Sequence, residues 1–192
     1  GATTEITIPS VSVTQEVGDA IIAALQNGET INTTLVNYGF DGSFDNGIIA
    51  HEYGHGISNR LIGGSSNSSC MQNNEQLGEG WSDYFGVAIT MKSEDTETTS
   101  RGVGTFAANQ PISGNGIRQY PYTTDMAVNP FTFNNVQDQA FEDGSVSVHG
   151  VGSIWATMLW DLQWKMINVY GFDADMYNGN GGNNKTMQLV TE

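Results

Sequence analysis

The sequence predicts an α+β chain in which a short β-α-β unit precedes a mainly helical region. Residues 1–36 combine a strand-like alternation with one helical repeat of apolar residues. Three longer helical patterns follow, near residues 48–61, 76–91 and 151–169. The stretches between them are rich in glycine, asparagine and proline, which favour turns and loops. We therefore divide the chain into residues 1–36 and residues 37–192.

The first unit is predicted from its alternation, cap and turn. Residues 6–13 alternate as a strand does, and Pro9 places that strand at a sheet edge. Thr14 can cap the helix that follows, because its hydroxyl can accept a hydrogen bond from the first helical turn. Asn27-Gly28 can then turn the chain into a second strand over residues 30–35.

The later helices are bounded by glycines and long connections. Gly63-Gly64 follows the first of them and is a typical C-terminal stop. We expect solvated loop in the acidic run 93–100 and in the tail 171–184. Residues 101–147 show little periodicity, and a connection of that length is usually functional or shaped by its neighbours. One face of the second helix is apolar and consists of Leu77, Trp81, Tyr84, Phe85 and Ala88.

Composition excludes several classes of function. With 6 basic against 21 acidic residues, the net charge is −15, so the chain cannot neutralise phosphates and we expect no nucleic-acid binding. We also expect no membrane span, because no apolar run approaches the roughly 18 residues required. A single cysteine excludes an intrachain disulfide framework. The chain begins at Gly1 and ends within an apolar segment, so we expect a piece of a longer precursor.

His51-Glu52-Tyr53-Gly54-His55 is an H-E-x-x-H motif. Residues four apart lie above one another on a helix, so both imidazoles can reach one Zn²⁺ ion. Glu52 then lies beside the open coordination position, where it can take a proton from a zinc-bound water. The alternative is a surface helix in which two histidines occur by chance.

The flanks of this motif favour burial. Ile48, Ile49 and Ala50 precede it, and buried histidines need partners. Gly54 and Gly56 each cost a helix roughly 1 kcal/mol relative to alanine. We expect that another element or a substrate approaches closely there.

Two acids on the second helix can complete the site. Glu79 and Asp83 are four apart, so Glu79 can be the third ligand, while Asp83 can accept the free ring N–H of a ligand histidine. The alternative is a pair of exposed acids, which is common in so acidic a chain.

The third histidine, His149, stands just before the tryptophan-rich helix. It can donate a hydrogen bond to the anionic oxygen of a tetrahedral intermediate, with Glu142 or Asp143 orienting it. The alternative is a histidine that only caps or packs near a helix start.

Four motifs in order resemble the fungalysin family of secreted zinc metallopeptidases. They are residues 41–61 around the H-E-x-x-H motif, residues 78–85 (GEGWSDYF), residues 118–126 (RQYPYTTDM), and His149 with the tryptophans and leucines of residues 155–162. Together they span about residues 41–190.

The resemblance implies a thermolysin-like, mostly helical catalytic lobe with the metal helix at the floor of a cleft. It implies endopeptidase activity on protein or peptide substrates, with Glu52 as base and His149 as transition-state donor. It also implies three zinc ligands: His51, His55 and Glu79. Arg118 and Tyr120 either line the substrate cleft or pack their own loop.

The sequence departs from the family pattern at three places. Ser153 stands where relatives often carry a glutamate. The β-rich N-terminal lobe is missing, and residues 1–36 resemble the end of a protease-associated domain found in some bacterial relatives. The family chain normally continues past Glu192, and Cys70 either pairs with a cysteine there or is a free thiol.

Three interpretations therefore stand. The first is a secreted zinc endopeptidase with a metal-activated water. The second is a non-catalytic, zinc-stabilised protein-binding module or inactive fragment. A further suggestion, with weaker spacing, is a Ca²⁺ site at Asp41 and Asp45 or in residues 93–100.

Overall fold

The computed structural model describes residues 13–32, 40–72, 77–141 and 144–192. The chain divides into two compact units, Gly1–Gly39 and Phe40–Glu192. In the described residues, no helix is long and apolar enough to cross a membrane.

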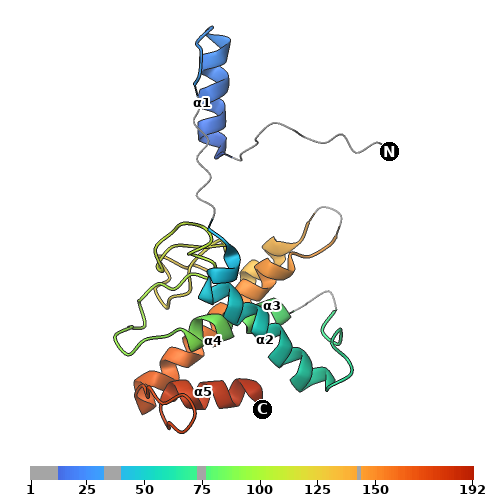
Figure 1. Cartoon of the computed structure of the whole chain (residues 1–192), viewed down its shortest axis with the longest axis vertical. Helices are drawn as coiled ribbons and strands as arrows, with labels where there is room; N and C mark the ends of the chain where they lie inside the picture. The colour runs from blue at the N-terminus through green and yellow to red at the C-terminus, as the bar shows by residue number, and fades with distance from the viewer. Residues whose placement is uncertain (1–12, 33–39, 73–76, 142–143) are drawn as a thin grey trace. The chain divides into compact units, whose positions relative to one another are not determined.

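The first unit contains the helix α1, Gln15–Gln26 (Figure 1). Its start is confirmed at the predicted cap, where the Thr14 hydroxyl accepts a hydrogen bond from Val17 N at 3.4 Å. Its end is confirmed at the Asn27-Gly28 turn, in which Gly28 has a φ of 78°. The predicted strands lie mostly outside the described residues, and the described parts, Val13 and residues 30–32, form no strand. The assignment of residues 1–36 to a protease-associated domain stays a prediction.

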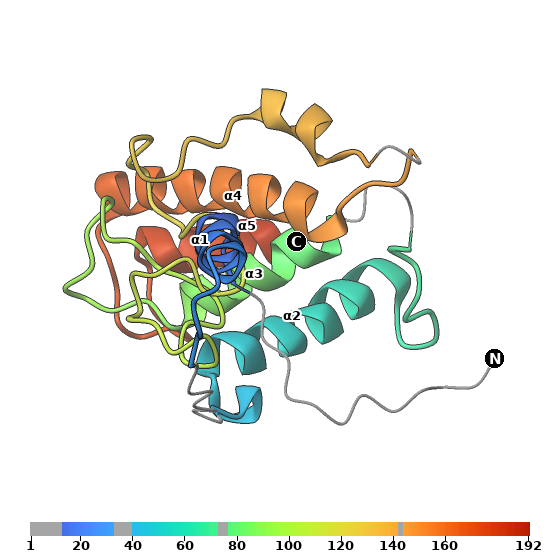
Figure 2. The ribbon, with the colours of Figure 1, turned by 90° about the horizontal axis from the view of Figure 1, so that it is seen from above.

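The second unit is mainly helical, as the sequence predicts. Figure 2 shows α3 between α2 and α4, and α5 and η2 both pack against α4. Its four α-helices and two short 3₁₀-helices in the described residues are η1 (Gly42–Phe44), α2 (Asn46–Gly63), α3 (Gly78–Ile89), η2 (Phe133–Gln139), α4 (Val148–Tyr170) and α5 (Gly182–Thr191).

Capping residues set the ends of α2 and α4. The Asp45 carboxylate accepts hydrogen bonds from the first turn of α2, and Gly64, with a φ of 71°, ends that helix at the predicted stop. Ser147 caps α4 by accepting from Gly150 N at 3.1 Å. The helix α4 therefore begins three residues earlier than the pattern near 151–169 predicts. The last helix, α5, begins inside the tail predicted as loop.

Small residues let the three central helices approach closely. A Cβ atom added to Gly54 of α2 would lie 2.8 Å from Ser82 Cα of α3, and one added to Gly80 of α3 would lie 2.3 Å from the carbonyl oxygen of Gly152 of α4. The close approach predicted at Gly54 is therefore confirmed. No protein atom lies within 4 Å of the corresponding position at Gly56, so packing within the described chain does not explain that glycine.

The face of α2 that is buried is polar rather than apolar. His51, Gly54 and Ser58 are its buried residues, whereas Ile49 is 49% exposed. The apolar flank of the motif therefore does not account for its burial. The motif is buried because α3 packs against the histidine face of α2.

The irregular segment 101–147 covers the end of this helical stack. It carries no named strand in its described part, but isolated bridges join Arg101 to Tyr122 and Val103 to Gly116. Val103 and Tyr122 belong to a buried cluster with Trp160 and Trp164 of α4. The segment is thereby held against the core, with its polar residues next to α3.

Candidate metal centre

The first half of α2 presents both histidines of the motif on one face. His51 is buried, His55 is partly buried, and their rings lie 4.8 Å apart between centroids at a right angle. Glu52 follows His51 and is exposed. The helix therefore separates the two imidazoles from the intervening carboxylate, as the spacing predicts.

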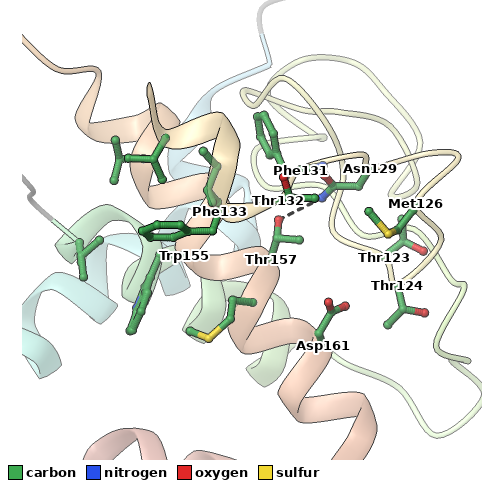
Figure 3. A pocket seen from close by; sticks show the side chains of 15 residues that line it. Thr123, Thr124, Met126, Asn129, Phe131, Thr132, Phe133, Trp155, Thr157 and Asp161 are labelled. Atoms are coloured by element: carbon green, nitrogen blue, oxygen red, sulfur yellow. Dashed lines mark hydrogen bonds between the residues drawn. The ribbon is translucent and has the colours of Figure 1, made fainter. Parts of the chain in front are cut away.

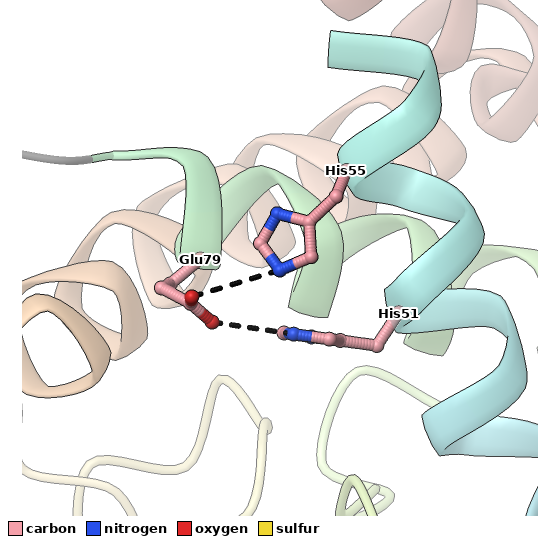
Figure 4. Close-up of side chains that lie close together, drawn as sticks. All are labelled: His51, His55 and Glu79. Carbon is pink, nitrogen blue, oxygen red and sulfur yellow. Dashed lines mark ion pairs between the residues drawn. The ribbon is translucent and has the colours of Figure 1, made fainter. Parts of the chain in front are cut away.

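The first turn of α3 brings Glu79 to the two imidazoles (Figure 4). Its Oε2 lies 3.2 Å from His51 Nε2, and its Oε1 lies 3.6 Å from His55 Nε2. One ligand atom from each residue lies within 4.8 Å of the others. The three side chains come from two helices that the Gly54–Ser82 contact holds together.

The carboxylate of Glu79 has an unused oxygen. Its Oε2 is buried and accepts no well-aligned hydrogen bond, although His51 Nε2 is near. A buried polar atom without a partner is costly. An ion among the three side chains would satisfy it, and two imidazole nitrogens with one carboxylate oxygen are a ligand set of catalytic zinc. The residues present therefore fit a metal ion.

Asp83 fixes the orientation of His51. It is fully buried one turn after Glu79, and its Oδ1 lies 2.6 Å from His51 Nδ1. When Nδ1 carries the proton and donates it to this carboxylate, the lone pair of Nε2 faces Glu79. This is the contact that the four-residue spacing on α3 predicts.

Two residues of the irregular segment hold Asp83 from the other side. Arg118 donates from Nε to Asp83 Oδ2 at 2.6 Å and from Nη2 to Oδ1 at 2.8 Å. The hydroxyl of the buried Tyr122 donates to Oδ2. Tyr122 lies four residues after Arg118 in the same motif, but the sequence pattern alone does not indicate a role for it. Only the fold of an aperiodic segment shows that both converge on one carboxylate.

These contacts shift the pKa values of the site in the metal-free chain. Burial alone would lower the pKa of His51, but its hydrogen bond to Asp83 and the nearby Glu79 carboxylate raise it to about 9. The proximity of His51 lowers the pKa of Glu79. Burial would raise the pKa of Asp83, but hydrogen bonds from His51 and Arg118 lower it. In the metal-free chain the extra proton is therefore on His51, between two ionised carboxylates, and it must leave before Nε2 can bind a cation.

His149 approaches from the third helix. It is the second residue of α4, inside the helix rather than before it, and its Nε2 lies 3.4 Å from Glu79 Oε2. Its side chain is 59% exposed, unlike that of His51. The structure therefore brings all three histidines to Glu79. The suggested orienting acids, Glu142 and Asp143, lie outside the described residues.

Comparison with known proteins identifies the family of this chain. The family description "fungalysin metallopeptidase (M36)" matches residues 13–192. This chain belongs to the fungalysin family. Membership implies a metal ion, and the three converging side chains fit one.

Relatives of this fungalysin chain include secreted fungal proteins. Extracellular metalloproteinase 2 of Trichophyton tonsurans is 41% identical over 160 residues, which cover 79% of this chain and 24% of the relative. Extracellular metalloproteinase 2 of Arthroderma otae is 45% identical over 138 residues, which cover 71% of this chain and 20% of the relative. Extracellular metalloproteinase 3 of the same organism is 39% identical over 169 residues, which cover 84% of this chain and 25% of the relative. The chain thus spans about a quarter of the length of these relatives.

The remaining predicted residues of this fungalysin chain lie around the centre. Tyr120 packs edge-on against Phe131, with ring centroids 5.0 Å apart, which favours loop packing. Ser153 donates to the carbonyl oxygen of His149 at 2.8 Å. Cys70 is a free thiol near the Asn59 carbonyl.

The acids suggested for calcium already accept backbone hydrogen bonds. Asp45 Oδ1 accepts from Gly47 N at 2.8 Å, and Oδ2 accepts from Ala107 N at 3.0 Å. Asp41 caps η1. In the acidic run, Asp95 pairs with the buried Arg101 at 2.7 Å. Calcium binding at these positions stays a prediction.

Proposed function

We propose that this chain is the catalytic lobe of a secreted zinc endopeptidase. The observation that carries the proposal is the convergence of His51, His55 and Glu79 on one point, with Glu52 next to the first ligand along α2. A zinc ion bound there supplies a Lewis acid that polarises the peptide carbonyl and lowers the pKa of a water molecule. The remaining chemistry belongs to side chains of this chain.

Glu52 acts as the general base. It is exposed on the same helix as the two histidines, so its carboxylate is free to meet a water molecule at the open side of the site. It takes a proton from the attacking water and passes it to the leaving amine nitrogen, which makes the amine a neutral leaving group.

His149 stabilises the negative charge that develops on the substrate carbonyl oxygen. Its side chain is 59% exposed while its Nε2 is 3.4 Å from Glu79, so it can reach a substrate that lies over the site. A donor placed at a developing oxyanion contributes about 2.7–4 kcal/mol to catalysis.

Asp83 and Arg118 act through other groups. Asp83 holds the tautomer and orientation of His51, and Arg118 neutralises Asp83 in a buried environment. The Arg118 side chain is only 6% exposed, which supports a positioning role rather than a place in the substrate cleft.

The substrates are proteins or peptides, and the site of action is extracellular. The names of the fungal relatives as extracellular metalloproteinases support both statements. The alternative is a zinc-stabilised binding module without activity.

Replacing Glu52 tests the proposal. Glu52→Gln keeps the shape of the side chain and all three ligands, so the variant should bind about one zinc per chain and lose at least 10²-fold in peptide turnover. Zinc is measured by atomic absorption after gel filtration, and turnover with a fluorogenic peptide, with and without a zinc chelator. His51→Ala and His55→Ala should lose the zinc itself.

The matched control is Glu94→Gln, which removes an exposed carboxylate of the same unit and should change neither readout. Equal turnover in the Glu52→Gln variant and the unaltered chain would refute the role of Glu52. A chain that binds zinc but cleaves no peptide in any form would favour the binding module.

A further inference from the structure

A pocket lies on α4, and none of His51, His55 and Glu79 lines it. It has a volume of about 600 Å³ and is formed by α4, η2 and the segment before η2 (Figure 3). This size is in the range of pockets that hold small molecules or several side chains. Its principal apolar walls are Met126, Phe131, Phe133, Val136, Trp155 and Met158.

Most polar side chains of the pocket are already paired. Asn129 Nδ2 donates to Thr157 Oγ1 at 3.1 Å and to the carbonyl oxygen of Pro121 at 3.1 Å. Thr124 Oγ1 donates to the carbonyl oxygen of Glu97 at 2.9 Å. These contacts hold the wall in place and leave the pocket with little unused hydrogen-bonding capacity.

Two lining residues are exceptions in the described chain: Trp155, whose buried indole Nε1 has no hydrogen-bond partner, and Asp161. Asp161 lines the pocket from α4 and is partly buried, and within the described part of the chain no hydrogen bond to its carboxylate is found. Burial raises the pKa of Asp161, and the charge of Lys165, one turn further along α4, only partly offsets this. The carboxylate is thus partly exposed and has no donor from the described chain, so a ligand in the pocket can donate to it.

The lining of the pocket is therefore complementary to a ligand that carries an apolar group next to a cation. In Figure 3, the aromatic side chains of Phe133 and Trp155 lie on one side and Asp161 lies on the other. The net charge of −15 of the whole chain also favours a cationic ligand. We propose that this pocket binds a polypeptide segment in which an apolar residue is followed by a lysine or arginine, with the basic group on Asp161.

The position of the pocket relates this segment to the metal centre. Val151, which lines the pocket, is two residues after His149, and Asp161 is ten residues after Val151 on the same helix. At 1.5 Å per residue, the pocket extends about 15 Å along α4, the length of four to five extended residues. His149 lies on another face of α4, because residues two apart on a helix do not face each other, so a peptide in the pocket reaches it only by passing around the first turn of the helix. The inference that it is then a substrate rests on the proposed function, whereas binding itself does not.

Binding is tested with the zinc-loaded Glu52→Gln chain, which should not cleave the probe. The probes are acetyl-Ala-Phe-Lys-Ala-amide and the same peptide with norleucine for lysine, which keeps the chain length without the charge. Isothermal titration should give a roughly tenfold lower Kd for the lysine peptide, the effect of one charge-assisted hydrogen bond. Asp161→Asn should remove this difference.

The matched control is Asp138→Asn, which removes a charge from η2 but does not line the pocket and should keep the preference. Phe133→Ala should weaken both peptides, because Phe133 lines the pocket while its side chain is 85% exposed and adds little to the fold. Equal affinities for the two peptides in the Glu52→Gln chain, an unchanged preference after Asp161→Asn, or no binding at millimolar peptide would overturn the proposal.

The link to cleavage has its own readout. In the chain that carries Glu52, Asp161→Asn should raise KM for substrates with a basic residue four or five positions from the scissile bond and leave kcat unchanged. An unaltered KM with normal peptide binding would overturn the link alone. Failure of the Glu52 test would leave the binding result in place, so the two proposals fail separately.

Discussion

The helices α1 and α3 both have twelve residues, but different interactions stabilise them. α1 has a side-chain cap at Thr14 and contains no buried residue. α3 has no side-chain cap, yet eight of its residues are buried, including the charged Asp83. The first helix is set by local signals, and the second is set by the helices on either side of it.

This difference explains where the functional groups lie. A twelve-residue helix without packing is marginal in water, so α1 cannot hold a side chain to within a fraction of an ångström. α3 is fixed by α2 at Ser82 and by α4 at Gly80. Glu79 and Asp83 flank those two contacts, so the proposed ligand and its partner are placed where the backbone is most constrained.

The largest expected effect follows from Asp83→Asn. The substitution removes the main countercharge of the buried Arg118 guanidinium and leaves only Glu79, whose Oε2 lies 3.8 Å from Arg118 Nη2, which should cost about 3 kcal/mol of unfolding free energy in the metal-free chain. It also removes the acceptor that orients His51, so zinc affinity should fall by about 10–100-fold. Urea denaturation with a chelator present measures the first effect, and competition with a zinc-binding dye measures the second.

Asp19→Asn in α1 is the control for this substitution. Asp19 is exposed, and its replacement should change the unfolding free energy by no more than about 0.5 kcal/mol. If Asp83→Asn proved as mild as Asp19→Asn, the buried network on α3 would not be the source of its stability.

Replacing a glycine by alanine should change the free energy of unfolding by a smaller amount. The change should be a loss in α3 and a gain in α1. At Gly80 the new methyl would lie 2.3 Å from the Gly152 carbonyl oxygen and 3.0 Å from Trp155 Cβ, so α3 and α4 must separate. We expect a loss of about 1–3 kcal/mol. At Gly18 in α1 the nearest atom is Val13 Cγ2 at 3.8 Å, and alanine should stabilise the helix by about 1 kcal/mol.

Two probes separate these outcomes. The second unit contains all four tryptophans, Trp81, Trp155, Trp160 and Trp164. Tryptophan fluorescence therefore reports on that unit during urea unfolding. Hydrogen exchange of the α1 amides reports the first unit. Stabilisation of the second unit by Gly80→Ala would contradict the close contact of α3 with α4 at Gly80.

The same contrast explains how much of the fold could be predicted from the sequence. Helices with caps or stops, such as α1 and α2, were predicted to within about two residues, because those signals are local. The start of α5 was assigned to a loop, since its first residues are glycine and asparagine. Gly182 begins that helix against the backbone of Met166 in α4, where a Cβ would lie 2.2 Å from the carbonyl carbon. Such a contact between segments leaves no local pattern.

The site divides in the same way. Spacing along single helices was enough to pair His51 with His55 and Glu79 with Asp83. The contacts of Arg118 and Tyr122 with Asp83 depend on how residues 101–147 fold, and that segment has no periodicity to read. The sequence could therefore supply the ligands but not the groups that neutralise the buried acid behind them.

The smallest expected effect is that of Thr14→Ala. The hydroxyl of Thr14 accepts a hydrogen bond from Val17 N at the start of α1, and loss of such a cap costs about 1 kcal/mol. Because α1 has no buried residue, this cost should fall on α1 alone: its amides should exchange about fivefold faster, while the tryptophan transition stays where it is. Thr14→Ser, which retains a hydroxyl, should restore the protection. A shift of the tryptophan transition in Thr14→Ala would mean that α1 shares its stability with the second unit, and the contrast between a locally set helix and a packed one would then no longer hold.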